Sequence, residues 1–239
     1  NNSDYLDIYF RELPFAIHRK WIEISNFQPK TIEAIKRKLV ETIDLDWHVQ
    51  EFMLEIGKQH GLRFITDIFS QRVERDAKSK SGKFWKTGKR YESVSYHLND
   101  ELRLFIVEHP EYVEVANEWI AKMTPKWSTY NFQITHLLQR LGSKFDEIVL
   151  SLIKRGSKQD LLKVSHLLRQ FEGSNFDLCV ELVRKTQDKH ILDQVRSDMY
   201  ATGVVSGEYG LAEAFKRKAE ALEKYKDDKD KNVRDFANQ

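Results

Sequence analysis

The sequence predicts an all-α protein, specifically an α-solenoid of antiparallel helix hairpins with a less regular N-terminal half. One observation is an internal repeat, because Ile134–Leu138 (ITHLL) returns as Val164–Leu168 (VSHLL) about 30 residues later. A period near 30 is typical of stacked helical arrays. The other is that four prolines and ten glycines in 239 residues leave room for long helices.

The N-terminal half contains a series of expected helices whose apolar residues recur every three or four positions. Pro14 and Pro29 suit the first turn of a helix, and Asp46 suits an N-cap. The expected helices cover residues 4–12, 14–24, 29–43, 46–56, 62–77, 99–108 and 110–123.

Helix starts, apolar stripes and helix stops recur together from residue 131 onward. Apolar residues at i, i+3, i+4 and i+7 begin at Ile134, Val164 and Phe176. Serine N-caps with an acid three residues later, and glycines at the stops, delimit these stripes. The expected caps are Ser143, Ser157 and Ser174, and the expected stops are Gly142, Gly156, Gly173 and Gly203. The alternative is one ordinary helical bundle with a chance similarity.

The C-terminal residues add a family resemblance. After a glycine-rich turn at 203–210, a long amphipathic helix is expected, followed by an acidic turn and the pattern Val-Arg-x-x-Ala. With Asp228, Val233, Arg234 and Ala237 in place, the last 30 or so residues resemble the inter-helix turn and second helix of a HEAT repeat. The resemblance is loose back to Trp127. It divides the chain into an irregular helical region at 1–125, with a basic loop at 78–95, and HEAT-like repeats at 126–239.

The run Gly203–Gly207 is also similar to segments in the C-terminal helical regions of bacterial NACHT/STAND-type ATPases and related antiviral proteins. That resemblance implies a sensor domain for an effector elsewhere in the same polypeptide. The nucleotide-binding motif of that family does not occur in this sequence. Because the chain does not begin with methionine, we expect it to be a fragment of a longer protein.

Composition narrows the classes of function. The 39 basic and 37 acidic residues give a net charge of +2, which disfavours a surface covered with nucleic-acid contacts. The single cysteine, Cys179, excludes an internal disulfide and suits a reducing, cytoplasmic setting. We expect a buried thiol there, no membrane span, no metal site and no cofactor.

Polar residues on the repeated helices form the first candidate site. In a HEAT-like array the second helix of each unit lines the concave side, which suits recognition of a protein or an anionic ligand. The expected partner-binding residues are Gln133, His136 and Arg140 on one helix, and Lys163, His166 and Gln170 on the next. The alternative is that both histidines form hydrogen bonds between neighbouring helices.

The basic, aromatic stretch 78–95 forms the second candidate site. Its cations could neutralise phosphates, while Phe84, Trp85 or Tyr91 could stack on bases. The expected nucleic-acid-binding residues are Lys83, Trp85, Lys86, Lys89 and Arg90. The alternative is a solvated loop whose aromatic residues fold back onto the helices. The spacing of Gly82 and Gly88 does not fit a phosphate-binding loop.

These observations lead to three hypotheses. The first is a non-catalytic recognition or scaffold module that binds a protein partner. The second is a nucleic-acid-binding module that uses the basic loop. The third, an enzyme such as a helical-repeat DNA glycosylase, is disfavoured because the sequence offers no catalytic acid beside a tryptophan pair.

Overall fold

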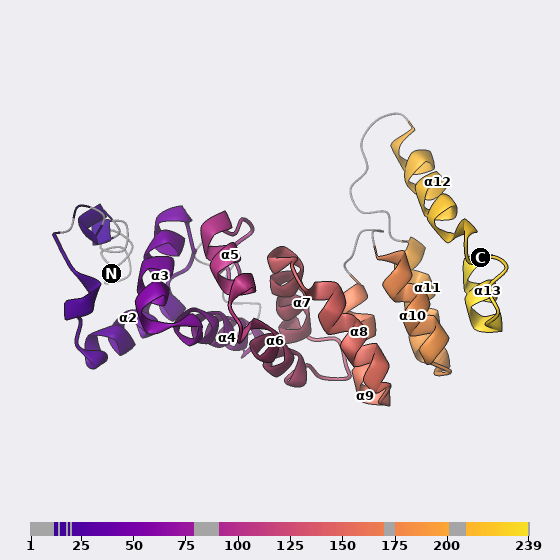
Figure 1. Cartoon of the computed structure of the whole chain (residues 1–239), viewed down its shortest axis with the longest axis horizontal. Coiled ribbons are helices and arrows are strands. Elements are labelled where there is room, and N and C mark those ends of the chain that lie inside the picture. The colour runs from indigo at the N-terminus through magenta and orange to yellow at the C-terminus, as the bar shows by residue number, and fades with distance from the viewer. Residues whose placement is uncertain are drawn as a thin grey trace. The chain divides into compact units, whose positions relative to one another are not determined.

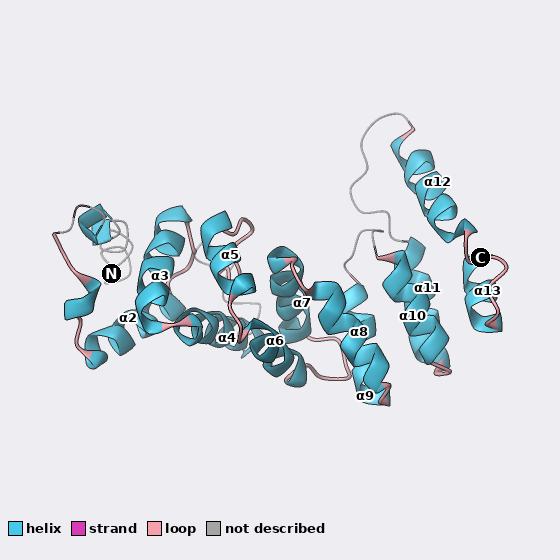
Figure 2. Cartoon of the chain, in the orientation of Figure 1, coloured by secondary structure: helices cyan, strands magenta, loops and turns pink. Residues whose placement is uncertain are grey.

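The computed structural model describes residues 12–13, 15–17, 19, 21–78, 91–169, 175–200 and 209–238. Throughout these ranges the chain consists of helices and the loops between them, without a strand (Figures 1 and 2). The predicted all-α class is confirmed. None of the helices in these ranges combines the length and the apolar composition needed to cross a membrane.

The chain forms two compact units. The first comprises Asn1–Lys122 with Ser128–Ser143, and the second comprises Met123–Trp127 with Lys144–Gln239. The helix at 129–141, which the sequence assigns to the second half, therefore belongs to the first unit. Each unit is described separately below.

The first unit is organised around α4, which packs against α2, α3, α6 and α7. A Cβ atom at Gly57 would lie 2.3 Å from Ile65 Cδ1, so α3 and α4 pack closely because residue 57 has no side chain. The bounds are η1 (Ile24–Asn26), α2 (Pro29–Glu41), α3 (Trp47–His60), α4 (Leu62–Lys78), α5 (Asp100–Glu108), α6 (Tyr112–Ala121) and α7 (Thr129–Leu141).

Local signals explain where most of these helices begin. Asp46 accepts a hydrogen bond from the Val49 amide at 3.0 Å, as its expected N-cap role requires. Asn99 caps α5 and Ser128 caps α7 in the same way. The helix expected at 14–24 is wrong at its C-terminal end, because residues 21–23 are not helical and a short 3-10 turn begins at Ile24. The helix expected at 4–12 lies almost wholly outside the described residues.

In the second unit the helices from α8 to α11 contact their near neighbours in the chain, while α13 packs on α10 and α12. Consecutive helices from α8 to α11 are in contact, and so are α8 with α10 and α9 with α11. This order of contacts is consistent with stacked helical hairpins. The bounds are α8 (Phe145–Arg155), α9 (Lys158–Leu168), α10 (Phe176–Lys185), α11 (Lys189–Tyr200), α12 (Gly210–Glu223) and α13 (Lys231–Ala237).

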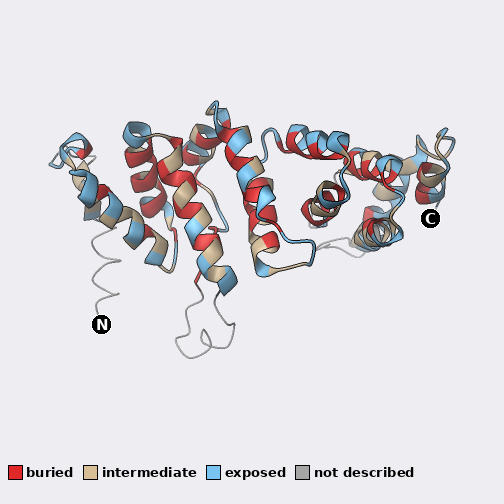
Figure 3. Ribbon diagram, turned by 90° about the horizontal axis from the view of Figure 1, so that it is seen from below, coloured by how far each residue is buried: buried red, intermediate tan, exposed pale blue. Residues whose placement is uncertain are grey.

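The predicted boundaries in this unit are partly confirmed. Ser157 caps α9 through the Asp160 amide at 3.0 Å, and Gly156 ends α8 with φ 69°. Ser143 is wrong as a cap, because Lys144 occupies the N-cap position of α8 with φ 61° and caps no amide with its side chain. Ser174, Gly173 and Gly203 lie outside the described residues. Figure 3 shows the buried stripes that alternate with exposed ones along the helices.

Candidate recognition surface

A buried arginine on α4 fixes the position of the chain around residues 91–93. The Arg72 side chain is fully buried. Its guanidinium donates to the carbonyl oxygens of Leu39 at 2.6 Å, Thr42 at 2.7 Å and Ser93 at 3.2 Å, and also to that of Glu92. The first two belong to the C-terminal end of α2, where carbonyl dipoles favour a cation. Arg72 therefore joins α4, the end of α2 and the segment that begins at residue 91.

Burial disfavours the charged form of this guanidinium. It lowers the pKa of Arg72 to about 10, chiefly through loss of solvation and in part through the nearby Arg75 cation. The group is still protonated at neutral pH. Its charge is accommodated mainly by backbone carbonyls.

Tyr91 also fastens this segment to α4. Its ring lies 4.7 Å from the Arg72 guanidinium carbon and 5.1 Å from that of Arg75. Its hydroxyl donates to the Val40 carbonyl at 2.6 Å, and the side chain is buried. The prediction that Tyr91 could stack on a base is therefore wrong, because its ring is already packed on α4.

From this anchor the chain runs to an exposed aromatic side chain, Tyr96. Glu92 holds the turn, because its Oε1 accepts from the Tyr96 amide at 3.0 Å. Tyr96 is 69% exposed, and its ring lies 4.8 Å from the guanidinium carbon of Arg140 on α7. Burial raises the pKa of Glu92, and the hydrogen-bonded carboxyl of Asp44 raises it further.

Of the three predicted residues of α7, Arg140 contacts this segment directly, and Gln133 shares its partner Asp76 with Ser93 of the segment. Gln133 donates to Asp76 Oδ2 of α4 at 2.8 Å. The half-buried His136 ring lies 4.5 Å from the Phe132 ring, and Arg140 packs on Tyr96. Burial, followed by the Arg140 charge, lowers the pKa of His136, so its imidazole is neutral at pH 7. We call Glu92, Tyr96, Gln133, His136 and Arg140 the Tyr96–Arg140 surface.

The predicted residues of the second unit have different surroundings. His166 is buried, with Nε2 3.0 Å from the Pro125 carbonyl oxygen and its ring 5.3 Å from the Trp127 ring. Its contacts are those of a packing residue rather than of an exposed ligand. Lys163 lies on the same helix, α9, while Gln170 lies outside the described residues. Because the two sets of residues belong to different units, a shared concave face stays a prediction.

The protonation of His166 gives a testable pH dependence. Burial lowers its pKa, and the Arg169 and His190 charges act in the same direction, against the opposing Pro125 hydrogen bond. The unfolded chain, with a histidine pKa of about 6.5, therefore takes up the proton first as the pH falls. We expect the opening free energy of α9 to decrease below about pH 6.5. Amide hydrogen exchange of α9 at pH 7.5 and pH 5, corrected for the intrinsic exchange rates at each pH, measures this opening free energy.

The matched variant is His166→Gln, whose amide can still donate to the Pro125 carbonyl. We expect this variant to lose most of the pH dependence of α9. A wild-type α9 whose opening free energy follows pH no more steeply than that of the variant would contradict the assignment.

The residues of the basic loop, Lys83, Trp85, Lys86, Lys89 and Arg90, lie outside the described part of the chain. Both ends of this stretch are anchored on the first unit, since Lys78 ends α4 and Tyr91 packs on α4. Their role in binding stays a prediction.

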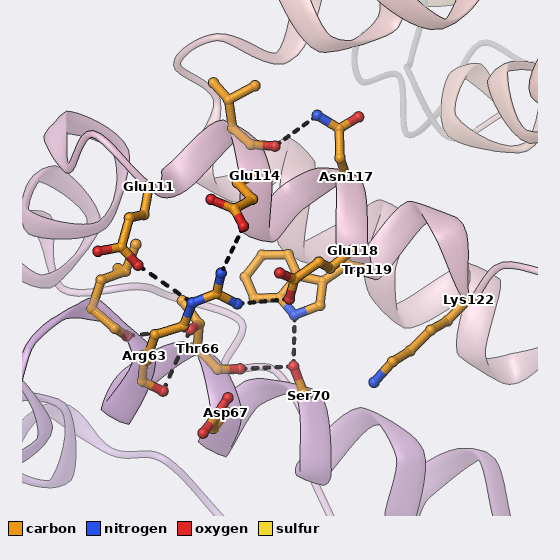
Figure 4. A network of polar contacts seen from close by, with 12 residues as sticks. Arg63, Thr66, Asp67, Ser70, Glu111, Glu114, Asn117, Glu118, Trp119 and Lys122 are labelled. Atoms are coloured by element: carbon orange, nitrogen blue, oxygen red, sulfur yellow. Dashed lines mark hydrogen bonds and ion pairs between the residues drawn. The ribbon is translucent and has the colours of Figure 1, made fainter.

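A second polar network joins α4 to α6 (Figure 4). Three glutamates of α6 and the turn before it converge on Arg63, at 3.4 Å for Glu111, 3.4 Å for Glu114 and 2.7 Å for Glu118. The side chains of these pairs are exposed, so each contributes little to stability. Beneath them the buried Trp119 donates to Ser70 Oγ at 2.6 Å. We interpret this network as structural.

The sequence prediction left out two residues of this region, and only the first of them carried a signal in the sequence. Arg72 lies on the apolar stripe of α4, seven residues after Ile65, where a charge needs an explanation. Tyr96 lies between expected helices, where helical periodicity says nothing about exposure.

The chain was compared with family models, curated proteins and solved structures, and none of them matches it. Among the residues that the structure describes, no group of three or more His, Cys, Asp or Glu is placed to hold a metal ion.

Proposed function

We propose that this chain is a non-catalytic recognition module that binds a protein partner through the Tyr96–Arg140 surface. One observation carries the proposal, namely that Tyr96 is 69% exposed although the guanidinium of Arg140 packs on its ring at 4.8 Å. Tyrosine and arginine are enriched among residues that dominate binding energies at protein interfaces. A side chain that is held in place before binding also loses less conformational entropy when the partner arrives.

The anchoring of this segment supports the proposal. Arg72 and Tyr91 hold its start, Glu92 closes the turn, and Gln50 receives the Asn99 amide at 2.7 Å near its end. Binding residues on a loop that a rigid scaffold positions are typical of recognition sites.

The proposal also covers the kind of protein to which this module belongs. The module is a HEAT-like region and acts as the sensor part of a bacterial defence protein in the cytoplasm. The repeat in the sequence and the contacts between successive helices of the second unit support the repeat character. The likeness of residues 203–207 to NACHT/STAND-type proteins supports the sensor role.

A photo-crosslinking experiment tests the binding surface. A benzophenone amino acid placed at Tyr96 is expected to form a covalent adduct with the partner in cells. The same amino acid at Trp47, which is 57% exposed on α3 of the same unit, is the matched control and should give no such adduct. Against the identified partner, Tyr96→Ala is expected to weaken binding about tenfold or more. Equal crosslinking from both positions would contradict the proposal.

Nucleic-acid binding through the basic loop is the second candidate, favoured because both ends of the loop are anchored on α4. If four cations each neutralise one phosphate of single-stranded nucleic acid, the logarithm of the binding constant should fall with the logarithm of salt concentration with a slope of about −3. The four cations are Lys83, Lys86, Lys89 and Arg90. Fluorescence anisotropy with a labelled oligonucleotide measures this slope. The absence of binding at low salt would exclude this candidate and leave the protein partner.

A further inference from the structure

Arg140 on α7 is an arginine whose hydrogen-bonding capacity is unused. Its guanidinium carbon lies 4.8 Å from the Tyr96 ring, but a ring contact does not satisfy the five N–H donors of a guanidinium. With the described residues the side chain forms neither an ion pair nor a hydrogen bond, and its Nη1 is buried without an acceptor among them. The donors of Arg140 are therefore available to a group from outside the described chain.

The other described arginines that are at least partly buried have acceptors. Each of them either has an acidic oxygen within 3.6 Å or donates to backbone carbonyls. They are Arg63, Arg72, Arg103, Arg196 and Arg234. Burial lowers the pKa of Arg140 through loss of solvation, and a buried donor without an acceptor adds a further cost. Arg140 is the exception that needs an explanation.

The second unit contains a similar arrangement in which a carboxylate is present. Arg169 follows the repeated histidine of α9 by three residues, as Arg140 follows that of α7 by four. The guanidinium carbon of Arg169 lies 4.7 Å from the Trp127 ring. Asp198 Oδ1 lies 3.7 Å from Arg169 Nε, and the Asp198 side chain is only 18% exposed. An aromatic ring, an arginine and a carboxylate thus occur together in this chain.

The first unit has the ring and the arginine without the carboxylate. Trp127 is half-buried, whereas Tyr96 is 69% exposed. Glu92 does not take the part that Asp198 plays, because it forms no ion pair with Arg140 and its Oε1 accepts from the Tyr96 amide. The position beside Arg140 therefore suits a carboxylate that a binding partner carries.

We propose that the partner of the Tyr96–Arg140 surface presents an aspartate or glutamate side chain to Arg140. This inference rests on the proposed function and specifies the partner as an acidic peptide segment. A guanidinium binds a carboxylate through two parallel hydrogen bonds, which gives both strength and orientation. Arg140 loses no hydrogen bond to a described residue when it turns toward the partner, so little opposes formation of the pair.

The charge of the surface favours a carboxylate over a nucleic-acid backbone. Gln133 is uncharged and the imidazole of His136 is neutral at pH 7, because burial lowers its pKa. Arg140 is therefore the single cation among the five residues of the surface. A phosphate backbone is held by several cations, each of which neutralises one phosphate. One guanidinium matches the single charge of a carboxylate.

Selection of random peptides displayed on phage, with the whole chain as bait, tests the inference. The peptides to be analysed are those whose binding Tyr96→Ala weakens, because these occupy the proposed surface. We expect them to share an aspartate or glutamate at one position. Replacing that residue with its amide should weaken binding about tenfold, and Arg140→Gln should do the same. Both changes together should weaken binding no more than either alone, as a double-mutant cycle requires of a direct pair.

Two further variants separate a specific pair from a general effect of charge. Arg37 is exposed on α2 of the same unit, so Arg37→Gln changes the net charge as Arg140→Gln does and should leave binding unchanged. Glu92→Gln keeps an oxygen that can accept from the Tyr96 amide and removes a negative charge. It should strengthen the binding of an acidic peptide and weaken that of a basic one.

The outcomes distinguish this inference from the proposed function. Peptides that need Tyr96 but bind Arg140→Gln as tightly as the wild type overturn the carboxylate and leave the proposed function standing. A shared basic residue in the peptides does the same. A labelled single-stranded oligonucleotide whose binding Arg140→Gln abolishes would assign the arginine to a phosphate and also overturn it. A library without any peptide that depends on Tyr96 contradicts the inference and the proposed function together.

Discussion

Replacing Arg72 with alanine is expected to lower the free energy of unfolding of the first unit by about 3–5 kcal/mol. The substitution removes the donor that Arg72 supplies to the buried carbonyl oxygens of Leu39 and Ser93 and to the half-buried one of Thr42. It also removes the cation on which the Tyr91 ring packs. Arg72→Lys should fall between the wild type and alanine, because an ammonium lacks the planar fork that reaches several carbonyls at once.

Arg75→Ala is the matched control for Arg72. Arg75 lies one turn further along α4 and also packs on Tyr91, but its bond to the Val40 carbonyl, at 3.3 Å, is exposed and is the one recorded within the described residues. We expect it to cost less than about 1 kcal/mol. Because the chain has two units, its unfolding need not be two-state. Hydrogen exchange of α4 and of residues 91–99 is therefore the suitable measurement. If Arg72→Ala and Arg75→Ala reduce exchange protection equally, the anchoring role of Arg72 is contradicted.

The Arg72 variant also bears on function. If Arg72 holds the segment after Tyr91, the Arg72→Ala substitution should make Tyr96 more mobile. Partner binding should then weaken, although every residue of the Tyr96–Arg140 surface is still present. Tyr96→Ala should instead weaken binding and leave the exchange of α4 unchanged.

Trp119→Ala is expected to cost about 3–5 kcal/mol in the same unit, because it empties a fully packed position between α6 and α4. Trp119 is 1% exposed, and its indole donates to Ser70 Oγ at 2.6 Å. Trp119→Phe keeps most of the ring and removes the bond, so it should cost about 1 kcal/mol plus a smaller packing loss. Ser70 retains its own bond to the Thr66 carbonyl at 2.8 Å.

Lys122→Ala provides the control for Trp119. It follows α6 directly and forms an exposed ion pair with Glu74 at 2.7 Å, which should be worth less than about 1 kcal/mol. Hydrogen-exchange protection of α6 and α4 is to be measured for Trp119→Ala, Trp119→Phe and Lys122→Ala. If Trp119→Ala and Trp119→Phe have the same effect, the packing contribution is absent and the prediction is wrong.

The candidate site shows where prediction from sequence stops. The i, i+3 and i+7 spacing of Gln133, His136 and Arg140 predicts that they share one helix face, and in the structure all three lie on α7. Their neighbours could not be inferred in the same way. Asp76 is 57 residues from Gln133, and Tyr96 comes from a segment without helical periodicity. His166 repeats the position of His136 in sequence, yet its partner is the Pro125 carbonyl in a preceding loop.

By itself, the sequence determined the all-α class, the approximate bounds of α2 to α6 and caps such as Asp46 and Ser157. These features depend on side chains within four residues of one another, and periodicity and capping patterns report on that range. Only the tertiary structure decided that α7 joins the first unit, that Arg72 binds carbonyls 20–33 residues away and that Phe215 stays exposed. These features depend on which helices meet, and that is settled by packing between distant parts of the chain.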